Sequence, residues 1–175
     1  MDRPIPFVPV VKSPKGSEEA DVEFITILKP PKYIKEKLIG KEIKVNEIKN
    51  FNVLLESITE ITIEKHVIQI PTESMFVFHK LLTFVQREDE EKLRKDLYYV
   101  YYMFRFCPQK GMLIQDIKSL IKDKKVGRNV VRNINKYFKN ADSKGPILIE
   151  RENGPDNFIG NVRADAYERI SQVLV

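Results

Sequence analysis

Three basic residues and one acidic residue lie close together in the segment 78–102, in a pattern that could bind an anion. Lys80 and Arg87 are seven residues apart, so on a helix their side chains point almost the same way. Lys95 and Asp96 follow on the next predicted helix, where Asp96 borders the apolar stripe. A carboxylate beside apolar neighbours is costly unless something binds it. The combination indicates a site for an anion, with phosphate as the first candidate.

A second group of candidate residues is acidic and lies on a predicted strand. Asp21 and Glu23 are two residues apart in DVEFIT, so in a strand both side chains point to the same face. Two carboxylates on one face can hold a divalent metal ion through oxygen ligands. The alternative is an ordinary solvated strand face opposite the core.

A third group is a basic stripe on a later helix. Arg128, Arg132 and Lys136 recur at four-residue intervals, so they share one face of a helix. Such a stripe can follow the phosphate backbone of RNA or DNA. A solvated helix face without a partner would have the same pattern.

The elements that must position these residues form an α+β pattern, in which a small mixed or antiparallel sheet precedes a helical part. Residues 1–71 are expected to form a β-rich portion, and residues 72–175 a helical portion that packs on it as one compact unit. Alternating apolar residues predict strands at 5–12, 21–28, 60–65 and 66–70. A further short strand is expected at Ile147–Glu150 in the loop-like segment 142–161. Helices are expected at 46–57, 73–86, 89–106, 112–122, 127–139 and 162–173.

The first predicted strand has an interrupted edge. Pro6 and Pro9 lie within it, and proline is confined to edge strands and bulges because it cannot donate to the ladder. An open sheet edge of this kind could accept a strand from a second copy or from a partner chain.

Composition narrows the function classes. The chain has 175 residues and a formal net charge of +5, which is compatible with a nucleotide or nucleic-acid partner. One cysteine excludes an intramolecular disulfide and fits a reducing cytoplasm. The sequence shows no apolar run long enough to span a membrane and no signal-peptide pattern, so we expect a cytoplasmic protein without a membrane partner.

The order of these motifs resembles that of the minimal nucleotidyltransferases of the polymerase-β superfamily, nearest to the AbiEii-type toxin nucleotidyltransferases and their relatives. The resemblance covers DVEFIT, a hairpin that ends in proline, FHKLL and LRKDLYYVYY. It implies that Glu23 is an active-site carboxylate and that Lys80 and Arg87 contact nucleotide phosphates. It further implies that Lys95 and Asp96 orient the site, and that the cofactors are Mg²⁺ and a nucleoside triphosphate.

Two departures from the family pattern change the expected activity. The family has an Asp-x-Asp metal-binding pair ahead of these motifs, which this sequence lacks, and it has a second aspartate where this chain has Tyr99. Because those acids hold the two catalytic metals, we expect a truncated or degenerate member that binds a nucleotide and is inactive alone. The alternatives are a non-catalytic nucleic-acid-binding module and a protein-interaction module, for example in a toxin–antitoxin system.

Overall fold

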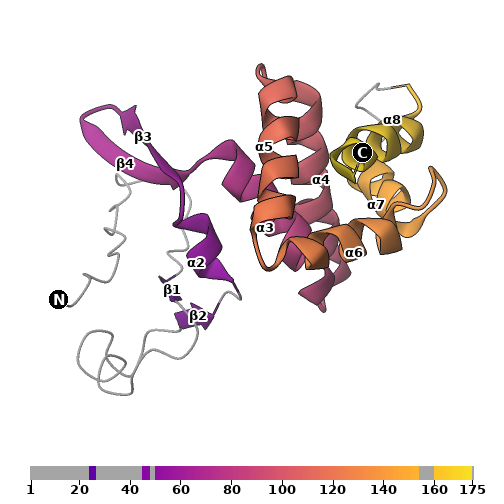
Figure 1. Ribbon diagram of the computed structural model, residues 1–175, viewed down its shortest axis with the longest axis horizontal. Helices are drawn as coiled ribbons and strands as arrows, with labels where there is room; N and C mark the ends of the chain where they lie inside the picture. The colour runs from indigo at the N-terminus through magenta and orange to yellow at the C-terminus, as the bar shows by residue number, and fades with distance from the viewer. Residues whose placement is uncertain (1–23, 27–44, 48–49, 154–159, 175) are drawn as a thin grey trace, which may run out of the picture. The chain divides into compact units, whose positions relative to one another are not determined.

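The computed structural model describes residues 24–26, 45–47, 50–153 and 160–174 (Figure 1). The chain divides into two compact units, Met1–Phe51 and Asn52–Val175. The predicted boundary between the β-rich and helical portions falls after residue 71, whereas residues 52–71 belong to the same unit as the helices. The first predicted strand at 5–12 lies outside the described residues, as do Asp21 and Glu23.

The first unit contains one short parallel pair of strands. Strand β1 (Phe24–Thr26) pairs with β2 (Val45–Glu47) in the register Phe24↔Val45. The prediction of a helix over 46–57 is therefore wrong at its start, because residues 46 and 47 belong to β2. Helix α2 covers only Phe51–Leu54, and it follows Asn50, whose φ of 58° is left-handed and interrupts regular structure there.

A two-stranded antiparallel hairpin follows, as predicted, but its first strand begins and ends two residues before the predicted range 60–65. Strands β3 (Ile58–Ile63) and β4 (His66–Pro71) are joined by a two-residue turn in which Glu64 has a φ of 56°. Directly paired residues share a face, which places Ile61, Ile63, Ile68 and Ile70 together on one side, the isoleucine face. Most residues of the hairpin are exposed. The exposed fraction is 52% for Ile63 and 63% for Val67.

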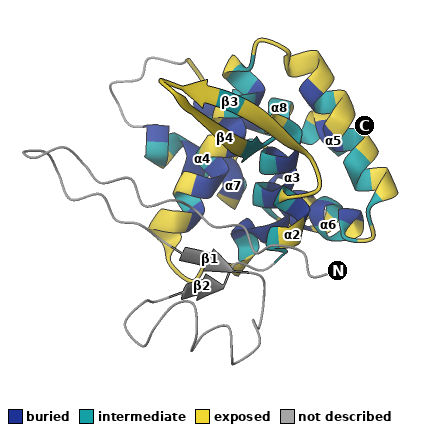
Figure 2. Ribbon diagram, turned by 90° about the vertical axis from the view of Figure 1, so that its left-hand side faces the viewer, coloured by how far each residue is buried: buried dark blue, intermediate teal, exposed yellow. Residues whose placement is uncertain are grey.

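The remaining described residues are mostly helical, so the α+β fold class is confirmed. The helices are α3 (Glu73–Thr83), α4 (Glu90–Phe106), α5 (Lys110–Asp123), α6 (Gly127–Tyr137), α7 (Lys144–Asn153) and α8 (Val162–Ser171), with 3₁₀ turns η2 (Phe84–Gln86) and η3 (Gln172–Leu174). Their buried faces meet in one core (Figure 2). Helices α3, α5 and α6 pack on one another, while α4 packs on α7 and α8.

Apolar stripes on α3 and α4 form much of this core. Met75, Phe78 and Leu82 of α3 are buried, as are Leu97 and Val100 of α4. No helix in the described ranges combines the length and apolar character needed to cross a bilayer.

Helix α7 contradicts the prediction of a strand at Ile147–Glu150. The run Ile-Leu-Ile is typical of a strand, but here it lies in a helix that buries Leu148 and Ile149. Pro146 is in the first helical turn, where its missing N–H costs nothing. Packing against α4 and α8 therefore outweighs the local β propensity.

Candidate functional site

Asp96 is the centre of a buried ion cluster. Only 3% of the residue is exposed, and its two carboxylate oxygens accept hydrogen bonds from two different cations. Lys80 Nζ binds Oδ1, and Arg87 Nε binds Oδ2 at 2.8 Å. The Lys80 side chain is 18% exposed and that of Arg87 is 40% exposed. The cluster carries a net charge of +1, because a carboxylate of the protein itself offsets one of the two cations.

The fold brings these three residues together from α3, the end of η2 and α4. Lys80 is in the last turn of α3, and Arg87 directly follows η2, while Asp96 is on the facing side of α4. Lys80 and Arg87 converge on Asp96, but not through helical spacing, because α3 ends at Thr83 and Arg87 lies beyond η2 with an extended backbone. Lys80 Nζ also lies 5.6 Å from the ring centroid of Phe76 and 5.8 Å from that of Tyr99. Tyr99, at the position where the family pattern has a second acid, supplies an exposed aromatic ring.

Lys95 lies outside the Asp96 cluster. Its Nζ donates to Glu91 Oε1 at 2.5 Å, one turn earlier on the exposed face of α4. This hydrogen bond, and then the attraction between the two charges, lowers the pKa of Glu91 and raises the pKa of Lys95. Consecutive helical residues differ in direction by about 100°, so Lys95 and Asp96 point to different surroundings and do not act as a contacting pair.

The Asp96 cluster does not suit Mg²⁺. A magnesium ion requires free carboxylate oxygens, and both oxygens of Asp96 are bound by cations. Within the part of the chain that the structure describes, no three or more acidic, histidine or cysteine side chains are grouped to hold a metal ion. The predicted metal ligands Asp21 and Glu23 lie outside the described residues.

A second ion network, which the sequence did not indicate, links α4 to α8. Tyr101 donates its hydroxyl to Asp165 Oδ2 at 2.8 Å, Arg105 binds the same oxygen, and Arg169 Nε donates to Oδ1 at 2.8 Å. Burial, and then the hydrogen bond to Asp165, raises the pKa of Tyr101 to about 12. Burial alone would raise the pKa of Asp165, but hydrogen bonds from Arg169, Tyr101 and Arg105 outweigh it and lower that pKa. The network therefore stabilises the packing of α8 on α4.

Helix α6 presents the predicted basic stripe to solvent. Arg128, Arg132 and Lys136 are exposed and form the α6 basic face, while Val130 and Ile134 on the other side are buried. No carboxylate among the described residues lies within 4 Å of the three cations. Among the described residues, the positive charge of the α6 basic face is therefore not offset by an acid, unlike that of the Asp96 cluster.

Two residues that sequence reasoning missed hold α6 in place. Gly127 begins the helix, and a Cβ at this position would lie 1.8 Å from the backbone oxygen of Ile121, so α5 and α6 approach too closely for any side chain. Asn133 Nδ2 donates to the backbone oxygens of Leu81 and Leu82 on α3, at 3.0 Å each. The position of Asn133 between the apolar residues Val130 and Ile134 could have indicated a side chain that needs polar partners, but not which partners.

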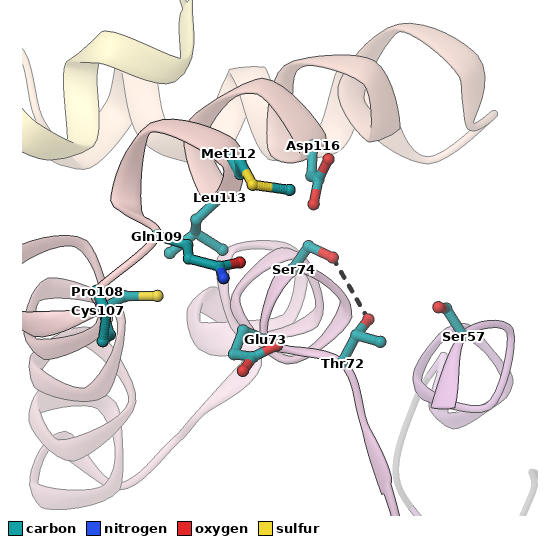
Figure 3. Close-up of a pocket in the computed structure, with 10 residues that line it drawn as sticks. All are labelled: Ser57, Thr72, Glu73, Ser74, Cys107, Pro108, Gln109, Met112, Leu113 and Asp116. Carbon is teal, nitrogen blue, oxygen red and sulfur yellow. Dashed lines mark hydrogen bonds between the residues drawn. The ribbon is translucent and has the colours of Figure 1, made fainter. Parts of the chain in front are cut away.

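A pocket of about 410 Å³ lies between the end of the hairpin, the start of α3, the end of α4 and α5 (Figure 3). Its polar lining includes the hydroxyls of Thr72 and Ser74, 3.4 Å apart, and the carboxylates of Glu73 and Asp116. None of the predicted site residues lines it. Two carboxylates make the lining of the pocket negative, so it would repel a phosphate group.

Comparisons of the chain with protein-family models, with curated proteins and with solved structures find no match. The function is therefore inferred from the charges, contacts and burial of its own residues.

Proposed function

We propose that the chain is a nucleic-acid-binding protein and that the α6 basic face is its contact surface. One observation carries the proposal: Arg128, Arg132 and Lys136 share one exposed helix face, and no described carboxylate neutralises them. Cations in this arrangement can replace the counterions that surround a phosphate backbone, and the release of those counterions drives binding.

The contrast with the Asp96 cluster supports this choice of surface. Lys80 and Arg87 are already held by a buried acid, so a phosphate there would have to compete with Asp96. The α6 cations have no such competitor in the described structure. Arg132 donates a hydrogen bond to the neutral side chain of Asn129 at 2.9 Å, which leaves its charge without an acidic partner among the described residues.

The test is a salt series with a charge-neutralised variant. Replacing Arg128, Arg132 and Lys136 together with glutamine should lower the slope of log affinity against log salt concentration by about 2 to 3, because each lost phosphate contact contributes about 0.9. The measurement is filter binding of labelled nucleic acid between 50 and 200 mM salt.

A matched triple variant controls for net charge. Lys65, Lys92 and Arg151 are exposed cations on the hairpin turn, α4 and α7. Replacing them with glutamine removes the same three charges and should leave the slope close to that of the unmodified chain. Equal losses in both variants would contradict a localised surface, and no binding by the unmodified chain would overturn the proposal.

Nucleotide binding at the Asp96 cluster is the second candidate, in line with the nucleotidyltransferase resemblance. Arg87 contacts Asp96 through Nε, so the outer nitrogens of its guanidinium group remain to bind phosphate oxygens. The exposed ring of Tyr99 lies beside Lys80 and offers a face on which a base could stack.

Calorimetric titration with ATP tests this second candidate. Arg87→Gln and Tyr99→Ala should each weaken ATP binding by about tenfold, since a lost charged hydrogen bond or stacked base costs roughly 1–3 kcal/mol. Arg151→Gln is the control and should leave the affinity unchanged. ATP binding that neither substitution at the cluster affects would rule the cluster out.

A further inference from the structure

We propose that the nucleic acid is duplex DNA, that α5 and α6 form a helix-turn-helix unit, and that α6 reads bases in the major groove through Asn129 and Asn135. This inference rests on the proposed function and specifies its ligand. Three observations support the inference: the short turn that joins α6 to α5, the contacts that hold α6 on α3, and the residue types on the outward side of α6.

The connection between the two helices is short and tight. Helix α5 ends at Asp123 and α6 begins at Gly127, so three residues make the turn. Figure 1 shows α6 lying across the end of α5. The close approach at Gly127 fixes this crossing, because a single methyl group there would meet the α5 backbone. Two helices joined sharply by a three- or four-residue turn are the arrangement that places a second helix in the major groove.

Helix α3 sets the rotation of α6 about its own axis. The last carbonyl groups of a helix have no partners within that helix. At the end of α3, the side-chain amide of Asn133 donates hydrogen bonds to two of these groups, the carbonyl oxygens of Leu81 and Leu82. The ring of Tyr137 packs edge-on against Phe84 at 4.9 Å between centroids, which fixes the other end of α6. Because Val130 and Ile134 are buried on the same helix, the opposite side of α6 is held outward.

The outward side of α6 carries the residue types that read base pairs. At about 100° per residue, an arc of roughly 120° contains Asn135, Arg128, Arg132, Lys136 and Asn129. The first four are exposed, and Asn129, at one edge of the arc, is half-buried. Arginine pairs with two acceptors of guanine, and asparagine pairs with a donor and an acceptor of adenine, both in the major groove. The hydrogen bond between Arg132 and Asn129 orders two of these side chains before any contact with DNA.

The dimensions favour DNA over duplex RNA. An eleven-residue helix is roughly 16 Å long, which matches about five base pairs of B-form DNA. The major groove of B-form DNA admits a helix, whereas that of A-form RNA is too narrow and deep for side chains to read. Lys125 and Lys139, both exposed, lie just beyond the two ends of α6, where cations can contact the phosphates on either side of a groove.

The test begins with selection of binding sites from a library of random DNA duplexes by the full chain. We expect an enriched sequence of about four to six base pairs, bound at least tenfold more tightly than single-stranded DNA or duplex RNA of the same sequence.

The substitutions Asn129→Ala and Asn135→Ala should each weaken binding to that sequence by about tenfold and relax the preference at one or two positions. Neither should change the salt slope, because asparagine carries no charge. Asn52→Ala, at an exposed position on α2, is the matched control and should have no effect.

The outcomes separate this inference from the proposed function. Salt-dependent binding that is as tight for RNA or single-stranded DNA as for duplex DNA would overturn the duplex assignment and leave nucleic-acid binding in place. Duplex binding without sequence enrichment, and without an effect of the asparagine substitutions, would overturn base reading by α6. No binding to any nucleic acid would overturn both.

Discussion

Replacing Gly127 with alanine should destabilise the helical unit by about 3 kcal/mol, at the upper end of what overpacking costs. The added Cβ would lie 1.8 Å from the backbone oxygen of Ile121, and backbone cannot rotate away as a side chain can. Either α6 must shift away from α5, or the turn between them must unwind. Urea denaturation followed by circular dichroism measures the loss, and the variant should also lose affinity for nucleic acid.

A second glycine provides the control for this prediction. Gly111 lies in the first turn of α5, and a Cβ there would have no atom within 4 Å. Alanine at this position should stabilise the protein by up to about 1 kcal/mol, because it favours the helix without a clash. If Gly127→Ala were as stable as the unmodified chain, the close crossing of α5 and α6 would be incorrect.

Replacing Asp96 with asparagine should cost about 3 kcal/mol of folding stability. The substitution keeps the shape of the side chain but removes the charge that compensates Lys80, which is largely withdrawn from water. Breaking one side of a buried ion pair leaves an uncompensated buried charge, and this penalty is larger than the value of the pair itself. The same denaturation measurement applies.

Two further variants make the Asp96 prediction specific. Glu91→Gln breaks the exposed pair with Lys95 on the same helix, and its unfolding curve should overlay that of the unmodified chain. A double variant, Lys80→Met with Asp96→Leu, should recover most of the stability, because it removes the less exposed cation together with Asp96, while Arg87, 40% exposed, keeps its contact with water. A double variant no more stable than Asp96→Asn would show that the cluster contributes something other than charge compensation.

Periodicity in the sequence predicted the parts of this fold that are decided locally. The apolar stripes of α3 and α4 repeat at helical spacing, so their buried faces could be assigned before the structure. The position of Asp96 beside such a stripe was enough to identify it as an acid that needs partners. Hairpin β3–β4 was also predicted, since alternating residues and a following proline mark a strand and its end.

The parts that could not be predicted depend on contacts between residues distant in sequence. Asn133 binds a carbonyl group 52 residues earlier, and Asp165 binds a tyrosine 64 residues earlier, and no local pattern encodes either contact. Helix α7 was mistaken for a strand because its Ile-Leu-Ile run favours a strand locally, while burial against two other helices decides the outcome. The family resemblance groups Lys95 with Asp96, whereas Lys95 pairs with Glu91 on the exposed face of α4, a contact that depends on the direction of each side chain on the helix.

The exposed hairpin has a consequence for how the protein unfolds. Strands β3 and β4 pair with each other, and both faces of the hairpin are largely open to water, so little of the core is lost if it opens. A two-stranded hairpin is marginally stable on its own. Its amide protons should therefore exchange with solvent through local opening, at a lower free energy than those of α4, whose buried stripe opens only with the whole helical unit. In this respect the second unit has two levels of cooperativity, and helix α6 belongs to the more stable one.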